Sequence, residues 1–402
     1  MTIVFFSNFI NHHQKPVADE LYRITGGNYT FVEVNPMYDW LKKGGYSDFS
    51  HLPYVLRAWE SEENRKKAEE LAISSDVALF GGHEVIDYAI LRSRSTNKIS
   101  FVVGERWLKK GWINLFSPRL LKFQWYYHTL FHEKPFYRLC SSAFAANDEY
   151  KMFSFKDRCY KWGYFTRVDT PISQQEVKVT QDFSSSDVVP IMWCSRFLKW
   201  KHPELPILMA EKLKGKGYRF SLDMYGSGIL YDRAITLAKK YAVDNIVRFC
   251  GNIPNDEILA AMRNHDIFLF TSDQNEGWGA VANEAMSNGC VLVGSDAIGS
   301  TQYLVNDKVN GLLFKSANKR SGFTKLTIKV DSIALDSLTE KVEWLLNHPL
   351  ERKQIAIAAY NNMKNVWSPK NAANNLISLI ENLQKGRDTL IEVGPCSKAF
   401  PL

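Results

Sequence analysis

Short apolar runs alternate with amphipathic stretches along most of the chain, and this alternation limits the fold more than any other feature. Runs of this length between turn-forming residues are typical of buried strands, and the stretches between them of helices. Strands that alternate with helices favour a parallel sheet covered by helices. We therefore expect an α/β domain over residues 1–170, with strands at Ile3–Phe6, Thr30–Val34, Val77–Phe80, Ile99–Val103 and Ala143–Ala146.

A second alternating series follows a polar stretch. Residues 171–188 lose periodicity and gain Ser, Gln and Asp, so we expect an interdomain linker there. The next strands are predicted at Val189–Cys194, Phe220–Tyr225, Ile246–Phe249, Ile267–Phe270, Val291–Val293 and Gly311–Phe314. Helices are predicted at Pro203–Leu213, Tyr231–Tyr241, Asn255–Arg263, Val281–Ser287 and Leu335–Asn347, with Asn255 as an N-cap.

The economical model is two doubly wound, Rossmann-like domains, 1–170 and 189–365, that face a central cleft. Ligands of such folds lie at the carboxyl ends of the strands. Residues 369–384 are predicted to form a last amphipathic helix, and we expect residues 366–402 to pack back on the N-terminal domain. The tail after Gly386 carries no clear signal.

Composition narrows the class of protein without naming a ligand. A chain of 402 residues suggests two or three domains, and a net charge of +7 proves no partner by itself. None of the six cysteines has the spacing of a zinc site, so we predict no metal and expect free thiols in a reducing compartment. The N-terminus lacks a basic signal-peptide region and no run of 18 apolar residues occurs, which favours a cytoplasmic location.

The segment Glu276–Glu284 places two carboxylates around a glycine-rich turn that leads from a strand into a helix. Free N–H groups at such a turn suit an anion or a hydroxyl group. If the segment is mostly helical, eight residues rise about 12 Å. Catalytic carboxylate pairs of glycosidases lie closer, at about 5–9.5 Å. The two glutamates therefore fit two anchors on a long ligand better than an acid/base pair, and the alternative is a solvated helix.

Other strand ends carry polar groups as well. Arg196, Lys199 and Lys201 follow one predicted strand and suit a diphosphate, although a solvated basic loop explains them equally well. Gly226 and Gly228 follow the next strand, where a tight turn is the simpler explanation. Asn252 and Ile253 follow a third strand, at a turn whose backbone suits a flat base or a plain connection.

The ordered set of motifs resembles the donor domain of family-4-type retaining glycosyltransferases with the GT-B fold. Among these enzymes it resembles the bacterial surface polysaccharide type. The resemblance covers roughly residues 189–315 and rests on Ser195-Arg196-Phe197, Tyr225-Gly226-Ser227-Gly228, Phe249-Cys250-Gly251-Asn252-Ile253-Pro254, Glu276–Glu284 and Asn310-Gly311-Leu312-Leu313-Phe314.

This resemblance implies a role for each donor-side residue. Arg196 and Lys201 would bind the donor diphosphate and stabilise its charge on departure, and Glu276 would hold sugar hydroxyls. Glu284 would hold the ribose hydroxyls, Asn252 and Ile253 would flank the base, and the glycine turn would place N–H groups on sugar and phosphate. These N–H groups belong to Gly277, Trp278, Gly279 and Ala280. The donor would be a nucleotide diphosphate sugar of the UDP or GDP type, with no cofactor and no metal.

The chain departs from the family pattern in three places. The family has Lys-Gly where this chain has Lys201-His202, and a glycine-pair loop where this chain has 7–16. Its acceptor-side histidine is replaced by Gly104-Glu105-Arg106. His12, His13, His83 and Glu105 follow predicted strands and are candidates for the acceptor side, with helix capping or turn formation as the alternative.

Residues 105–138 combine seven Lys or Arg and only two Glu with ten aromatic residues. Basic residues among Trp and Tyr are typical of a helix at a membrane interface, although an aromatic core with a basic rim has the same composition. We expect contact with an anionic membrane, peripheral at the inner face. No nucleic-acid-binding motif occurs.

The sequence thus predicts a retaining, metal-independent hexosyltransferase that moves a sugar onto a saccharide or lipid-linked acceptor. A nucleotide-sugar epimerase or a glycoside phosphorylase on the same fold is one alternative. A catalytically silent, nucleotide-sugar-binding subunit is another.

Overall fold

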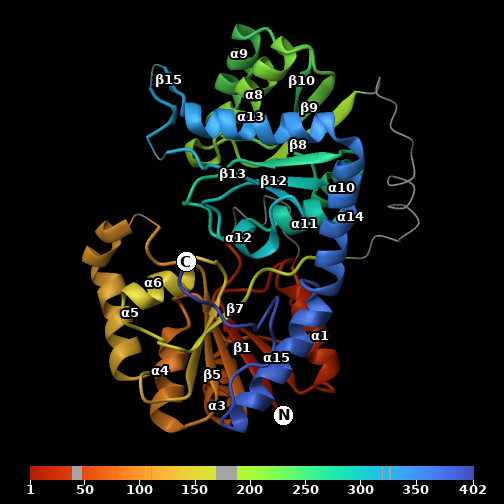
Figure 1. Ribbon diagram of the computed structural model, residues 1–402. Coiled ribbons are helices and arrows are strands. Elements are labelled where there is room, and N and C mark those ends of the chain that lie inside the picture. The colour runs from red at the N-terminus through yellow and green to blue at the C-terminus, as the bar shows by residue number, and fades with distance from the viewer. Residues whose placement is uncertain (39–47, 110, 169–187, 319, 326) are drawn as a thin grey trace. The chain divides into compact units, whose positions relative to one another are not determined.

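The computed structural model describes residues 1–38, 48–109, 111–168, 188–318, 320–325 and 327–402, which form two compact units (Figure 1). Unit 1 comprises Met1–Thr166 and Val366–Leu402, and unit 2 comprises Arg167–Asn365. Each unit contains one parallel sheet with helices, as the alternating pattern predicted. The linker predicted at 171–188 lies, except for its last residue, outside the described residues, so the domain limits stay a prediction.

Unit 1 is built on a seven-stranded parallel sheet of order β3-β2-β1-β4-β5-β6-β7. Its central strands are buried on both faces, which explains their continuous apolar runs. The strands are β1 (Ile3–Ser7), β2 (Tyr29–Glu33), β3 (Val55–Arg57), β4 (Val77–Gly81), β5 (Ser100–Gly104), β6 (Phe136–Cys140) and β7 (Cys159–Lys161).

The helices of unit 1 include one from the far end of the chain. Helix α15 (Pro369–Gln384) packs on α1 (Lys15–Ile24), and Ser368 Oγ caps its first turn. The tail beyond it runs antiparallel to β7, because Lys398 pairs with Tyr160. The other helices are α3 (Glu62–Ser74), α4 (Ile86–Ser95), the 3₁₀ helix η1 (Gly111–Phe116), α5 (Pro118–Thr129) and α6 (Ala145–Lys151).

One predicted strand of unit 1 is wrong. The small apolar residues of Ala143–Ala146 lie in a turn and at the start of α6, and the strand that precedes them is β6. Arg138 lies in the middle of β6 and is buried although it is charged. This charged residue interrupts the apolar run by which a buried strand is recognised. The carboxylate of Glu149, in α6, pairs with that arginine.

Unit 2 is built on a six-stranded parallel sheet of order β10-β9-β8-β11-β12-β13. These strands are β8 (Val189–Cys194), β9 (Phe220–Tyr225), β10 (Val247–Gly251), β11 (Ile267–Phe270), β12 (Val291–Ser295) and β13 (Leu312–Phe314). All six predicted strands are confirmed to within two residues. A short antiparallel pair, β14 (Gly322–Phe323) and β15 (Ile328–Lys329), lies outside the sheet.

The helices of unit 2 follow the predicted alternation. They are η2 (Lys199–Lys201), α8 (Glu204–Gly215), α9 (Tyr231–Lys240), α10 (Asn255–Arg263), α11 (Val281–Ser287), α12 (Thr301–Leu304), α13 (Ser332–Asn347) and α14 (Pro349–Asn365). Helix α14 was not predicted. Asn255 is not the N-cap of α10, because the capping position belongs to Pro254.

The basic aromatic segment 105–138 divides between core and surface. Phe123, Tyr127, Phe131 and Phe136 are buried, and each ring contacts the next along the segment. A second set is exposed, namely Ile113, Phe116, Leu121 and Trp125. The segment therefore contributes to the core of unit 1 and also leaves an apolar surface on η1 and α5. In the part of the chain that the structure describes, no helix is long and apolar enough to cross a membrane.

Candidate functional site

An ion pair joins the loops that follow two neighbouring strands of unit 2. Strands β8 and β11 pair in the sheet, so their carboxyl ends lie side by side. Lys201 follows β8 and Glu276 follows β11, and the Lys201 ammonium donates to Glu276 Oε2. Both side chains are more than nine-tenths buried. The two side chains therefore belong to one site, although 75 positions separate them in the sequence.

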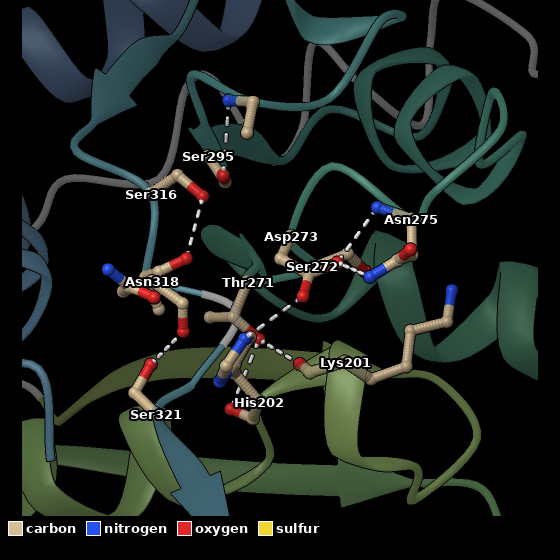
Figure 2. Close-up of polar contacts among 12 residues, drawn as sticks. Lys201, His202, Thr271, Ser272, Asp273, Asn275, Ser295, Ser316, Asn318 and Ser321 are labelled. Atoms are coloured by element: carbon tan, nitrogen blue, oxygen red, sulfur yellow. Dashed lines mark hydrogen bonds and ion pairs between the residues drawn. The ribbon is translucent and has the colours of Figure 1, made fainter. Parts of the chain in front are cut away.

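Further hydrogen bonds fix this pair. Ser272 Oγ donates to the same Glu276 Oε2 over 2.7 Å. Thr271 Oγ1 donates to the Lys201 carbonyl over 2.7 Å (Figure 2). Asp273 N donates to the Trp200 carbonyl over 2.9 Å. Among the described residues, no hydrogen bond reaches Glu276 Oε1. That oxygen is the acceptor left over for a hydroxyl group.

A second cation stands beside the pair. Arg196 lies in the same loop after β8 and is exposed. Burial lowers the pKa of Lys201, Glu276 raises it, and the positive charge of Arg196 lowers it again; the net shift is downward. Two cations that repel each other at a strand end favour an anion there, because an anion relieves the repulsion.

His202, next to Lys201, is buried between two carboxylates. Its Nδ1 lies 2.7 Å from Glu204 Oε1, and its Nε2 lies 3.7 Å from Asp273 Oδ2. Burial lowers the pKa of His202, but Asp273 and Glu204 outweigh it and raise the pKa to about 9. The imidazole is therefore a cation at neutral pH.

The raised pKa of His202 predicts a loss of stability in alkali. An unfolded histidine titrates near 6.5, so its contribution is fully present below that pH and is lost as the pH rises through about 9. We expect the melting temperature of the wild type to fall between pH 7 and 10 by more than that of His202→Gln. Parallel slopes for the two proteins in a buffer-matched thermal scan would contradict the assignment.

The glycines after β9 explain how two loops approach each other. A Cβ on Gly226 would lie 2.0 Å from the Ser195 carbonyl oxygen, and a Cβ on Gly228 would lie 2.8 Å from that of Phe197. Both glycines have positive φ angles, 120° and 147°. Phe197 N donates to the Ser227 carbonyl over 2.8 Å. This loop therefore supports the backbone on either side of Arg196, and a direct ligand contact of the two glycines stays a prediction.

The glycine-rich turn between the two glutamates is fixed by its own side chains. Trp278 is fully buried, its Nε1 donates to Asn283 Oδ1 over 2.8 Å, and its carbonyl accepts from Ser300 Oγ. A Cβ on Gly279 would lie 2.2 Å from the ring of Phe270. The side chain of Trp278 thus belongs to the core, and only main-chain groups of Gly277, Trp278, Gly279 and Ala280 remain as candidate ligand contacts.

The helical spacing assumed for Glu276 and Glu284 is wrong, because α11 begins only at Val281. The two carboxylates nevertheless have different surroundings. Burial raises the pKa of Glu284 to about 7, and a hydrogen bond from Asn255 opposes that shift. Asn252 is exposed and Ile253 half-buried, both just beyond β10.

The candidate acceptor residues follow the carboxyl ends of neighbouring strands in the unit 1 sheet. His12 and His13 follow β1, His83 follows β4 and Glu105 follows β5, and these three strands are neighbours. The rings of His12 and His13 lie 3.8 Å apart, and burial lowers the pKa of both, that of His13 to about 3 with a contribution from His12.

The other two acceptor candidates have local partners. Glu105 accepts from Tyr164 Oη over 3.0 Å and from Lys109 Nζ over 2.7 Å, whereas His83 is exposed and pairs with Glu84. The strand order places the four candidates at the same end of the unit 1 sheet. Their local contacts do not identify a ligand.

Comparison with known proteins finds a family similarity within unit 2. Residues 185–330 match the family model of glycosyl transferases group 1. This stretch, a little over a third of the chain, is similar to glycosyl transferases group 1. The Bacillus subtilis (strain 168) protein YtcC, named as a glycosyltransferase, is 34% identical over 125 residues, which are 31% of this chain and 28% of YtcC. The match thus spans less than a third of that relative.

Solved structures with similar folds are GT-B glycosyltransferases. Anabaena HepE, solved in complex with UDP-glucose, has a TM-score of 0.63 at 14% identity over 94% of this chain and 99% of its own. Sucrose-phosphate synthase from Thermosynechococcus elongatus has a TM-score of 0.67 at 14% identity over 96% of this chain and 100% of its own. The chain therefore has the GT-B fold, as expected from its motifs.

Within the matched stretch, three residues that complete the site were not predicted from the sequence. Thr271, Ser272 and Asp273 follow β11 directly and bind the backbone or side chains of the residues at 200–202 and 276. Their position, polar and next to a predicted strand end, was a usable signal. The cation at His202 was visible only as a departure from the family pattern.

Proposed function

We propose that this protein is a retaining glycosyltransferase that takes a sugar from a nucleotide diphosphate sugar. The observation that carries the proposal is the buried Lys201–Glu276 pair beside the exposed Arg196, at the carboxyl ends of two adjacent strands. Ligands of doubly wound folds bind at such ends. HepE, a structure of the same fold, was solved with UDP-glucose.

In the proposed reaction, the cations act on the leaving group. Negative charge develops on the diphosphate as the bond to the sugar breaks, and fixed cations in a partly buried site stabilise that charge without reorganisation. Arg196 offers a planar fork for two oxygens and Lys201 a point charge. Glu276, held by Lys201 and Ser272, presents Oε1 to a sugar hydroxyl.

Retention of configuration is the outcome that the resemblance to retaining glycosyltransferases implies. The Oε2 of Glu276 is engaged by a cation and a hydroxyl, so this oxygen is not a candidate nucleophile. The proposal therefore has the acceptor attack from the leaving-group side. The coupling constant of the anomeric proton of the product, measured by NMR, tests this point, and an inverted product would refute it.

A thermal-shift panel of nucleoside diphosphates and their sugars tests the donor class. A ligand present at about 100 times its Kd adds about 2.7 kcal/mol of stability. We expect a shift with at least one UDP or GDP sugar and none with Lys201→Met under the same conditions. If no member of the panel shifts the wild type, the proposal fails. Turnover that needs free phosphate and no acceptor would favour a phosphorylase, and binding without transfer a silent subunit.

We further propose that unit 1 docks on an anionic membrane that carries the acceptor. Leu121 and Trp125 lie four positions apart on the exposed side of α5, together with the exposed Arg119 and Lys122. Phe116, 82% exposed, adds a large ring directly before the helix. Exposed aromatic residues among cations suit a membrane interface, where each basic residue contributes about 1 kcal/mol.

Co-sedimentation with vesicles of anionic and of neutral lipid checks this surface. We expect Phe116→Ser combined with Trp125→Ser, and separately Arg119→Gln combined with Lys122→Gln, to release the protein from anionic vesicles. Leu390→Ser removes another exposed apolar side chain of unit 1 and should have no effect. Wild-type protein that stays in the supernatant with anionic vesicles would refute the docking.

A further inference from the structure

His202 has a backbone conformation that calls for an explanation. Its φ and ψ are 48° and 55°, in the left-handed region that favours glycine, and Pro203 follows it. A residue before proline is also biased towards extended conformations. The side chain at this position is 1% exposed and does not simply point into solvent. Contacts of the imidazole must therefore compensate for the backbone.

Those contacts connect two loops and a helix. Glu204 begins α8, and Asp273 follows β11, so the imidazole lies between two different elements. Asp273 Oδ1 accepts from the backbone N and side-chain Nδ2 of Asn275, each over 2.8 Å, which leaves Oδ2 facing His202 (Figure 2). His202 thus ties the loop of Lys201 to the loop of Glu276, in parallel with their own ion pair.

The charges around this site differ with and without the imidazolium. Three carboxylates lie here, on Glu204, Asp273 and Glu276, and the Lys201 ammonium goes to Glu276. From the remaining side β14 packs on the imidazole with Gly322, which brings no charge: a Cβ there would lie 3.5 Å from Nδ1. Without a cation at 202, Glu204 and Asp273 would face the proposed diphosphate site uncompensated.

We propose that His202 is a positioning residue, whose buried cation fixes the loop of Lys201 and neutralises Glu204 and Asp273 so that a nucleoside diphosphate can bind. The inference rests on the proposed function, because it assumes that Lys201 meets a diphosphate. It extends that function by making diphosphate binding depend on a titratable group outside the ligand contacts. The raised pKa of His202 means that this dependence appears on the alkaline side.

The test uses variants that keep the backbone conformation. His202→Gly suits a left-handed residue and removes the cation, and His202→Gln keeps the size of the side chain if the glycine variant does not fold. Ala242→Gly is the matched control, because Ala242 is exposed in the same unit with a φ of 53°. The probes are UDP and GDP, whichever binds the wild type, and the corresponding nucleoside.

We expect the Kd of the diphosphate to rise about tenfold in His202→Gly at pH 7.5, and that of the nucleoside to stay within twofold. Between pH 7.5 and 9.5 the wild type should lose affinity for the diphosphate, and the variant should lose less. A merely structural role would lower the melting temperature without changing this pH profile. Equal affinities and profiles for His202→Gly and Ala242→Gly would overturn the inference.

The same experiment separates this inference from the proposed function. If Lys201→Met abolishes diphosphate binding while both His202 variants bind normally, only the role of His202 is overturned. If the wild type binds neither UDP nor GDP, the proposed function fails and the inference fails with it.

Discussion

Replacing Lys201 with Met is expected to lower turnover at least about tenfold, a loss of about 1.4 kcal/mol of transition-state stabilisation, and nearer a hundredfold if the lysine acts alone on the leaving diphosphate. The change also leaves the Glu276 carboxylate buried without its cation. An unpaired buried charge costs about 3–5 kcal/mol of folding free energy, so loss of activity and loss of fold must be separated.

Two further variants make that separation. Lys201→Met combined with Glu276→Gln removes both charges and should recover most of the stability without recovering turnover. Lys239→Met changes an exposed lysine in the last turn of α9 and should leave the rate within about twofold, since surface substitutions are usually mild. The rate of nucleoside diphosphate release measures all three. Wild-type turnover in a folded Lys201→Met protein would refute the role of this lysine.

The second large effect is expected in unit 1. Arg138→Met should destabilise that unit by about 3–5 kcal/mol, because its Nε lies 2.8 Å from Glu149 Oε1 and both side chains are almost fully buried. Glu149 also accepts from Trp107 Nε1 over 2.7 Å and from Ser154 Oγ over 2.6 Å. At about 2–4 °C per kcal/mol for a domain of this size, the melting temperature should fall by roughly 10 °C.

The neighbouring Glu105 gives this cluster a functional meaning. Arg138 Nη2 donates to the Glu105 carbonyl over 3.0 Å, so the arginine also positions a candidate acceptor residue. Arg138→Met combined with Glu149→Gln should regain part of the stability, since the amide oxygen of a glutamine still accepts from Trp107 and its NH2 group can donate to Ser154 Oγ. The exposed pair of Arg65 with Glu62 is the control, and Arg65→Met should cost less than about 1 kcal/mol. An equal cost for Arg65 and Arg138 in calorimetry would contradict the expectation.

The sequence predicted what depends on local pattern. Strands β8, β9 and β11 and helices α10, α11 and α15 were predicted to the residue, because their apolar periodicity and turn residues are strong. The short edge strands β3 and β7 were missed. Strand β7 is short and contains a lysine. Residues near 398 cover its free edge, and no local pattern encodes a contact across more than 200 positions.

The same distinction applies to the site. Strand-end placement brought Arg196, Lys201 and Glu276 to one edge of the predicted sheet, and the structure joins the last two directly. That pairing could not be predicted, since it depends on the exact course of two loops 75 positions apart. The burial of Trp278 and the packing role of Gly226 could not be predicted either, because both depend on residues outside their own turns.

The division of unit 1 between two distant stretches of the chain has a consequence for biosynthesis. The ribosome completes unit 2 before it makes α15 and the segment that pairs with β7. At about 5–20 residues per second, the first stretch of unit 1 waits roughly ten seconds or more with one strand edge and one helix face uncovered. Unpaired edges of this kind recruit other chains, so chaperones that shield nascent strands are expected to matter more for this unit than for its neighbour.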